Sequence, residues 1–356
     1  MLNFKTILCS VSALCLSSAA WASENTGYYA FAKYRYFGPK LATDNYNHVL
    51  DTDEASATRF YPNIAKLQYN QFKNIARTVK TAVGYGDWNK EYRVMSGFEY
   101  DGKRTKNSKG NYGYEQESGS FYFLSDKAVC KPNWHIGGGG VFSKYDGDFA
   151  NGLKQKEDGV LAVAYAIYND AENQVRFSSR AYLGYAENDM SRRSLTGIYK
   201  DDFNSFYYGW ENSVSKTFQK GIFYVQPQID INGLGVKRNA FDDGIYSSPS
   251  SDSFLWYGFL DLYLGIKGKD AFENTYNLKA GPELTRVFSD PYDSFYALNG
   301  TDVLYFKDRK DKRDYVTWKA YLNYGFSNGV GIYADFRYYV KDADSTAYSL
   351  GVNYRF

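Results

Sequence analysis

The chain has 356 residues, among them 37 Tyr and 25 Phe, and its mean hydropathy is -0.54. So polar a chain cannot be a bundle of membrane helices, since nothing after residue 22 approaches the roughly 18 apolar residues that a spanning helix needs. Many aromatic residues at a low mean hydropathy are typical of a membrane β-barrel, whose apolar outer face and polar lumen cancel in any sequence average. The formal net charge of +2 gives no reason to expect a nucleic-acid partner.

Residues 1–22 have the pattern of a signal peptide. A charged start at Lys5 precedes an apolar run over residues 6–16 and the small-residue exit Ala20-Trp21-Ala22. The alternative is an N-terminal anchor helix, for which the apolar run is too short. The pattern predicts export across the inner membrane and cleavage after Ala22. Only Cys130 of the three cysteines would then remain, so no disulfide is expected within one mature chain.

Residues 23–61 offer no visible repeat, whereas residues 62–84 have the pattern of a helix. Pro62 precedes it and Gly84 closes it. Its apolar residues are at helical spacings, and its polar side is basic through Lys66, Lys73, Arg77 and Lys80. We expect this helix inside the barrel lumen; the alternative is a surface helix in the periplasm.

From about residue 91 onward, apolar and polar residues alternate with the period of two that is typical of β-strands. In the last run, Tyr348, Leu350, Val352, Tyr354 and Phe356 share one face. The pattern predicts an all-β fold over residues 85–356, a transmembrane antiparallel β-barrel of about twelve strands in the cell outer membrane. A water-soluble β-sandwich is the alternative. The expected strands are 91–101, 113–124, 133–145, 158–169, 173–186, 203–217, 221–236, 253–267, 274–288, 314–326, 329–340 and 346–356.

Loop length predicts which end of each strand faces the periplasm, because periplasmic turns are short and extracellular loops long. The short connections, expected in the periplasm, are 169–174, 327–329 and 341–345. The long ones, expected outside the cell, are 188–202, 239–252 and 289–314.

Charged residues on the inward register are the candidate pore-lining residues. A basic helix in such a lumen would be held by charge and hydrogen bonds. The candidates are Arg93, Glu99, Arg176, Arg180, Glu211, Asp230, Asp261, Lys279, Glu283, Asp335 and Arg337.

Three sequence stretches, in this order after a signal peptide and a helix, resemble the β-domain (translocator) of autotransporters, the type V secretion family. They are Tyr182–Asn188, the Gln226-Pro227-Gln228 strand with Asn232-Gly233-Leu234, and the terminal Gly351–Phe356. The resemblance implies that the helix occupies the pore after a passenger has crossed. It also implies that the barrel-assembly machinery reads the aromatic-ended last strand, with Tyr348, Tyr354 and Phe356 as the signal. Periplasmic chaperones during biogenesis, outer-membrane lipid and a monomeric state are the further expectations.

Only residues 23–61 separate the expected signal peptide from the helix, too few for the three or more stacked repeats of a solenoid passenger. We expect a vestigial passenger and little or no cargo. Residues 28–37 are one β-prone run that could be displayed, or could add a strand or plug.

The sequence offers no catalytic, metal or cofactor motif, so we expect no enzyme. His135 lies on an inward register, but no neighbouring segment offers an evident Ser or Asp partner. The glycines 137–140 indicate close backbone approach, either of an aromatic neighbour or of the helix.

Two other functions remain open. One is a passive diffusion porin for small polar or anionic solutes such as sugars. Its lumen would attract anions through Arg93, Arg176, Arg180, Lys279 and Arg337 and stack sugar rings on Tyr182, Tyr224 and Tyr333. The other is a structural or adhesive surface protein that acts through its long loops.

Overall fold

The computed structural model describes residues 64–84, 91–105, 114–130, 133–149, 153–194, 197–242, 247–248, 250–289, 294–299, 302–307, 314–340 and 345–356. The expected signal peptide (1–22) and the segment 23–61 lie outside the described residues.

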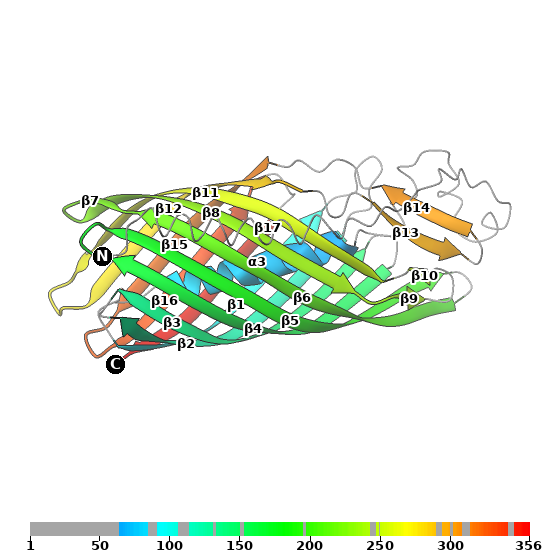
Figure 1. Ribbon diagram of the computed structural model, residues 1–356, viewed down its shortest axis with the longest axis horizontal. Helices are drawn as coiled ribbons and strands as arrows, with labels where there is room; N and C mark the ends of the chain where they lie inside the picture. The colour runs from blue at the N-terminus through cyan, green and yellow to red at the C-terminus, as the bar shows by residue number, and fades with distance from the viewer. Residues whose placement is uncertain are drawn as a thin grey trace. The chain divides into compact units, whose positions relative to one another are not determined.

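The described chain consists of one helix followed by strands (Figure 1). The helix is α3, Ile64–Gly84. The long strands are β1 (Tyr92–Thr105), β2 (Tyr114–Cys130), β3 (Trp134–Phe149), β4 (Leu153–Asp170), β5 (Val175–Ser194), β6 (Gly197–Lys216), β8 (Phe223–Arg238), β11 (Ser251–Lys269), β12 (Thr275–Val287), β15 (Asp314–Gly325), β16 (Val330–Tyr339) and β17 (Ser345–Arg355). The short ones are β7 (Phe218–Lys220), β9 (Phe241–Asp242), β10 (Ser247–Ser248), β13 (Ser294–Asn299) and β14 (Asp302–Lys307).

The long strands form a closed antiparallel barrel of twelve strands. Closure is made by β1, which pairs with β2 on one side and with β17 on the other. At this seam the backbone amides of Tyr92 and Phe356 each donate to the other's carbonyl, at 3.1 and 3.2 Å. A closed sheet leaves no unpaired edge, as a bilayer requires. The predicted fold class and all twelve predicted strands are confirmed.

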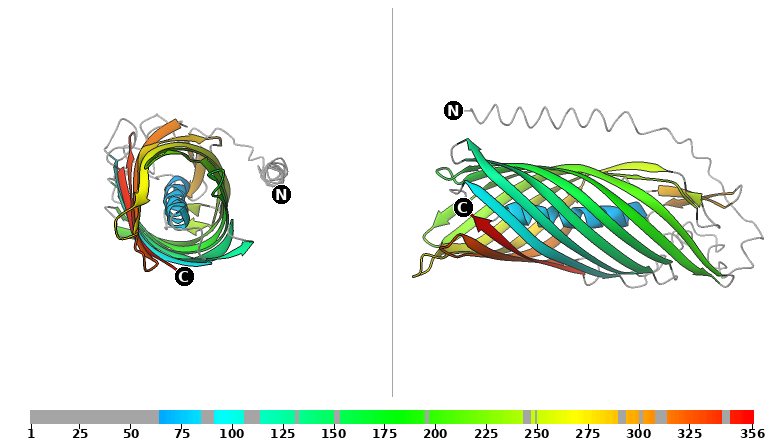
Figure 2. Two further views of the ribbon diagram at one scale, coloured as in Figure 1. Left: turned by 90° about the vertical axis from the view of Figure 1, so that its left-hand side faces the viewer. Right: turned by 90° about the horizontal axis from the view of Figure 1, so that it is seen from below.

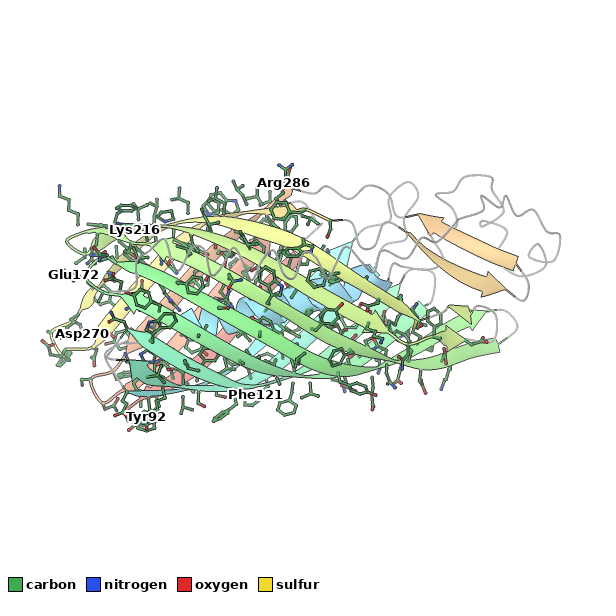
Figure 3. All side chains as sticks on the ribbon, in the orientation of Figure 1. Tyr92, Phe121, Glu172, Lys216, Asp270 and Arg286 are labelled. Atoms are coloured by element: carbon green, nitrogen blue, oxygen red, sulfur yellow. The ribbon has the colours of Figure 1, made fainter. Side chains whose placement is uncertain are left out.

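Side chains alternate between the two faces of the barrel wall as the sequence pattern predicts. In β17, Leu350 is 64% exposed on the outer face, whereas Ser349 is buried on the inner face. Phe121 of β2 likewise projects outward (Figure 3). Apolar outer residues on most strands therefore form a belt around the barrel, which is the surface that contacts lipid in an outer-membrane barrel.

Successive turns between strands lie at opposite ends of the barrel, and this corrects the predicted orientation of one short connection. The turn 326–329 joins β15 to β16 at the end where the C-terminus lies, because the Arg355 amide donates to the Gly329 carbonyl at 3.1 Å. β16 then runs to the other end, where Tyr339 pairs with Ser345 at the start of β17. The connections 327–329 and 341–345 therefore cannot both face the periplasm, as loop length predicted, because successive strands of an antiparallel barrel alternate in direction.

The turn between β11 and β12, at the end of the barrel where the C-terminus lies, is stabilised by hydrogen bonds to Asp270. Asp270 accepts hydrogen bonds from Tyr324 Oη at 2.6 Å and from the backbone amide of Phe272 at 2.8 Å. These donors stabilise the carboxylate and lower the pKa of Asp270 to about 2.

All three of the predicted long loops contain strand structure. The predicted loop 188–202 is largely a continuation of β5 and β6, which reach Ser194 and start at Gly197. Within 239–252 and 289–314 lie β9, β10, β13 and β14, which pair in the order β14-β13-β10-β9. Backbone pairing thus continues past the point where apolar alternation ends.

Candidate functional site: the helix in the barrel lumen

α3 lies inside the ring of strands (Figure 2). Its apolar side chains are buried, with Phe72 at 1% and Val79 at 0% exposure. The Phe72 ring meets Tyr182 and Tyr207 of the barrel edge-on, with centroids 5.7 and 5.4 Å apart. The predicted helix 62–84 is thus confirmed from Ile64 onward. Among the described residues, no helix is long and apolar enough to cross a membrane.

The basic side of the helix contacts carboxylates of the barrel wall. Arg77 Nη2 lies 2.6 Å from Glu283 Oε1, and its guanidinium group lies over the Phe259 ring, 4.7 Å from the centroid. Lys80 Nζ lies 2.8 Å from Asp230 and 3.1 Å from Asp261. In a lumen of low dielectric such pairs are much stronger than in water, provided that every charge keeps its partner.

These contacts extend into one alternating series of charges, here named the ion-pair chain. Its members, in order of contact, are Arg77, Glu283, Lys319, Asp261, Lys80, Asp230, Arg180 and Glu211. Lys319 contacts both Glu283 and Asp261, and its Nζ lies 3.2 Å from Asp261 Oδ1. Arg180 Nε lies 3.1 Å from Glu211 Oε2. The ion-pair chain has four cations and four carboxylates, so it is balanced. Two of its cations belong to α3, which is thereby fixed to the wall.

Threonines on α3 contact a second charged group. Arg337 Nη2 donates to Thr78 Oγ1 and to Glu99 Oε1, both at 2.8 Å. Thr81 Oγ1 donates to Asp335 Oδ2 at 3.1 Å. The predicted lumenal residues of β1 and β16 therefore meet the helix, whereas the two threonines were not predicted as contacts.

The N-terminal half of α3 has its own anchor. Asn74 donates through Nδ2 to Asp101 and accepts a hydrogen bond of 2.9 Å from Tyr339 Oη. Gln68 Nε2 donates to Ser205 Oγ at 2.6 Å. Asp101 was not predicted, although it follows Glu99 by two residues and so shares its inward face.

The last turn of α3 contains no basic residue of its own, and the barrel supplies one. Arg176 of β5 donates to the carbonyl oxygens of Gly84 at 2.7 Å and Val83 at 3.0 Å. Those carbonyls have no partner within the helix and carry the negative end of its dipole. Arg176 thus caps the C-terminus of α3.

Another charged cluster is formed by residues of the barrel wall. Asp126 accepts from Arg93, from Tyr165 Oη at 3.0 Å, and contacts His135 Nδ1 at 2.9 Å. The expectation that His135 has no acidic partner is wrong. Asp126 was overlooked because the predicted strand ended at residue 124, whereas β2 runs to Cys130.

The other predicted residues differ in their surroundings. Lys73 Nζ lies over the Tyr315 ring, 5.8 Å from its centroid, and Lys279 Nζ donates to Gln226 at 3.1 Å. The side chain of Lys66 lies outside the described residues. Tyr348, Tyr354 and Phe356 are exposed on the outer face of β17 and at its end, where Phe356 stacks on Tyr92. Their reading as an assembly signal stays a prediction.

The glycine run of β3 is explained mainly by the close backbone of its neighbours: an added methyl group would first meet the carbonyl oxygen of Ser125 at Gly137, of Val163 at Gly138 and of Phe123 at Gly139. An aromatic ring is close at Gly137 as well. A methyl group on Gly137 would meet the Tyr165 ring at 2.7 Å, and the backbone of β2. The predicted close approach is confirmed at this position for an aromatic side chain.

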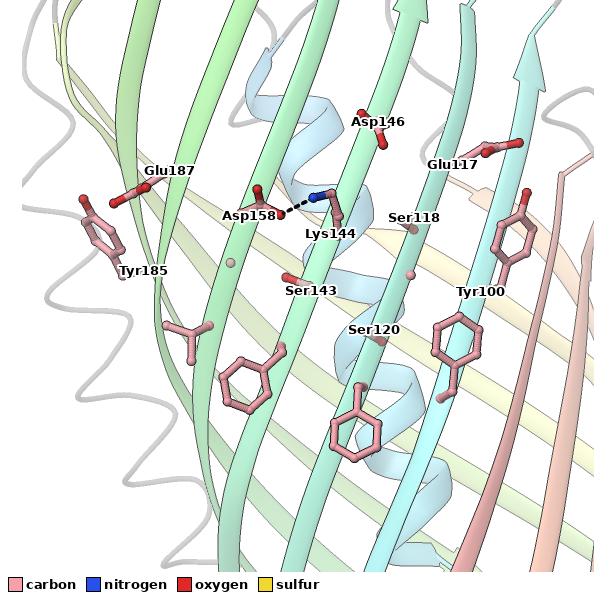
Figure 4. A pocket seen from close by; sticks show the side chains of 16 residues that line it. Tyr100, Glu117, Ser118, Ser120, Ser143, Lys144, Asp146, Asp158, Tyr185 and Glu187 are labelled. Atoms are coloured by element: carbon pink, nitrogen blue, oxygen red, sulfur yellow. Dashed lines mark ion pairs between the residues drawn. The ribbon is translucent and has the colours of Figure 1, made fainter.

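A hollow on the outer face of β1 to β5 marks one border of the apolar belt (Figure 4). Phe121 and Phe142 line one part of it. Lys144 and Asp158, 3.3 Å apart, lie in the other part, next to Gly159. The outer face therefore changes from apolar to charged within this hollow.

Among the described residues, no group of three His, Cys, Asp or Glu side chains is placed to hold a metal ion.

A closed twelve-strand barrel preceded by a helix defines the class of translocator barrels. The chain belongs to the autotransporter β-domain family, whose sequence model matches residues 94–337, more than half of the chain. Members of this family are outer-membrane proteins, and translocator domains are not enzymes.

Two solved structures share the fold. The translocator domain of the autotransporter NalP from Neisseria meningitidis is 16% identical with a TM-score of 0.60, covering 83% of this chain and 96% of its own. The β-domain of the Bordetella autotransporter BrkA is 14% identical with a TM-score of 0.58, covering 75% and 100%. None of the curated protein sequences compared with the chain matches it.

Proposed function

We propose that α3 closes the pore of this translocator barrel to free diffusion, after the polypeptide that precedes the helix has crossed the lumen. The observation that carries the proposal is the ion-pair chain, in which Arg77 and Lys80 of the helix are paired with Glu283, Asp230 and Asp261 of the wall. A helix in free exchange with water would lose these partners. Leaving would strand buried carboxylates, which is costly in a medium of low dielectric.

A diffusion porin is the weaker alternative. Three of the four arginines that would attract anions are paired with carboxylates: Arg93 with Asp126, Arg180 with Glu211 and Arg337 with Glu99. The fourth, Arg176, donates to carbonyl oxygens at the end of α3. A paired cation attracts a passing anion much less than a free one does.

The route to the membrane is part of the same proposal. Residues 1–22 would direct export, with cleavage after Ala22. The barrel-assembly machinery would then read Tyr348, Tyr354 and Phe356, and periplasmic chaperones would guard the unfolded chain, which becomes a monomeric barrel in lipid. The exposed aromatic face of β17 supports this assignment. By the same family argument, we propose that the chain is not an enzyme.

The test is single-channel conductance in planar lipid bilayers, comparing the refolded chain without residues 1–22 with a variant that also lacks residues 23–84. We expect a small or flickering conductance that rises steeply on deletion, with folding of both proteins checked by heat-modifiable gel mobility. An equally large, steady conductance in both proteins would contradict the plug and favour the porin.

A further inference from the structure

A small cavity lies beside the C-terminal turn of α3, between the helix and strands of the wall. Its volume is about 50 Å³, whereas one water needs roughly 10–15 Å³ on the same measure. It can therefore hold a few waters or one small polyatomic ion. Lys80, Arg176, Arg180 and Lys279 all line it, and no carboxylate does among its described lining residues.

Lys279 is a cation of this lining that the ion-pair chain does not neutralise. Each carboxylate of that chain already has a cation of the chain beside it, and the chain is balanced. Within the described part of the protein, Lys279 has no ion pair: its Nζ donates to the neutral amide of Gln226 at 3.1 Å. It also lies 4.4 Å from the centroid of the Tyr263 ring and 5.0 Å from that of Tyr321. A rim of aromatic rings and an amide leaves most of its charge uncompensated.

Arg180 adds a second buried cation to the lining of the same cavity. Its side chain is 2% exposed, and its Nε and Nη1 donate to Glu211 and Ser178. Its Nη2 has no hydrogen-bond partner among the described residues, since Asp230 Oδ1 is 3.9 Å away. A buried guanidinium nitrogen without an acceptor is costly, and its positive charge adds to that of the cavity lining.

Solutes can reach the cavity, because Lys279, Gln226 and Gly84 are only partly buried. The hydroxyl groups of Ser178, Ser213 and Ser215 add further donors to its lining. The cavity thus combines excess positive charge, hydroxyl donors and access.

We propose that this cavity binds a small oxyanion of the phosphate type, held by Lys279, with the charges of Lys80, Arg176 and Arg180 beside it. Lys80 and Gly84 of α3 line the same cavity, so the bound ion joins the helix to the wall. The link between helix and wall rests on the proposed function, whereas binding of the ion does not. A ligand that binds only the plugged form stabilises that form by mass action.

The test is isothermal titration calorimetry of the refolded chain with inorganic phosphate, at constant ionic strength set with sodium chloride. We expect saturable binding at one site per chain. Lys279→Gln should weaken it about tenfold or more, because a charge-assisted hydrogen bond is lost. The matched control is Lys216→Gln, an exposed lysine outside the cavity, which should bind phosphate as the original protein does. Heat that never saturates, or equal affinity in Lys279→Gln, would overturn the proposal.

A second variant separates loss of the site from loss of the fold. Gln226→Glu places a carboxylate beside Lys279 without changing the size of the side chain. It should abolish phosphate binding while raising the thermal midpoint of unfolding, because the internal carboxylate replaces the ion. Undiminished phosphate binding in this variant would also overturn the proposal. If phosphate binds as expected but does not prolong the closed state in bilayers, the site stands and its link to the plug fails.

Discussion

Buried charges in this lumen depend on one another. Within the ion-pair chain, Glu283 lies between Arg77 and Lys319, and Asp261 between Lys319 and Lys80. Taking each ion from water is costly, and only a complete set of partners offsets that cost. Removal of one member leaves a buried charge without compensation, so single substitutions here should have larger effects than on the surface.

Two arginines allow a direct comparison. Arg77 pairs with Glu283 in the lumen, whereas Arg286 pairs with Asp314 at 3.8 Å with both side chains 67% exposed. Arg77→Gln should lower the free energy of unfolding by about 3–5 kcal/mol, as removal of one partner of a buried pair does. Arg286→Gln should change it by about 1 kcal/mol or less, because surface pairs contribute little. Urea titration in lipid vesicles measures both, and effects of equal size would contradict the account.

Residue partners were harder to predict than residue faces. Alternation predicted an inward face for Arg180 and Glu211, both of which are buried. Their contact follows from the register of β5 against β6, in which they stand opposite each other. Arg93 and Asp126 likewise stand opposite across β1 and β2. Register depends on turn length and on where each strand ends, which a period of two does not specify.

At the scale of one element, α3 differs from a surface helix in having partners on all sides. The spacing of its apolar residues is that of an α-helix, so the sequence predicted both the helix and its length. The sequence of the helix could not reveal its C-terminal cap, because Arg176 comes from β5, far along the chain. Asn74, Thr78 and Thr81 gave no signal either, as isolated polar residues on a helix are usually solvated.

The cap makes a prediction about local stability. Arg176→Gln should speed hydrogen exchange of the amides in the last turn of α3, residues 81–84, about fivefold, since a cap contributes about 1 kcal/mol. Residues 68–74 of the same helix are the internal control and should exchange as before. Hydrogen-exchange mass spectrometry of the refolded protein measures both segments. A uniform change along the helix, or none, would show that Arg176 is not a cap.

At the scale of the whole molecule, the hydrogen-bonded strands extend beyond the apolar belt on the outer face of the barrel. The predicted strands ended where apolar alternation ended, which is the border of the belt. Pairing continues beyond it, so β5 reaches Ser194 although the expected strand stopped at residue 186. The sequence therefore predicted the membrane-embedded part of each strand better than the full strand.

The belt can be tested at its centre and at a turn. Leu350, in the middle of β17, is 64% exposed, and Phe272, in the turn after β11, is 79% exposed. Leu350→Lys should cost about 2–4 kcal/mol of unfolding free energy in lipid vesicles, the range for a lysine at the bilayer midplane. Phe272→Lys should cost about 1 kcal/mol or less. A larger loss at Phe272 than at Leu350 would place the belt elsewhere.

The central claim is that α3 closes the pore through specific contacts with the wall, and exchange of one contact tests it most directly. Asn74 donates to Asp101, so Asn74→Asp sets two buried carboxylates against each other, and Asn74→Asp with Asp101→Asn restores the pair in reverse. Single-channel conductance at pH 8 should rise in the single variant, about tenfold in open probability for each 1.4 kcal/mol of repulsion, and return to the original level in the double variant. Conductance that stays high in the double variant, or that is the same in all three proteins, would contradict the claim.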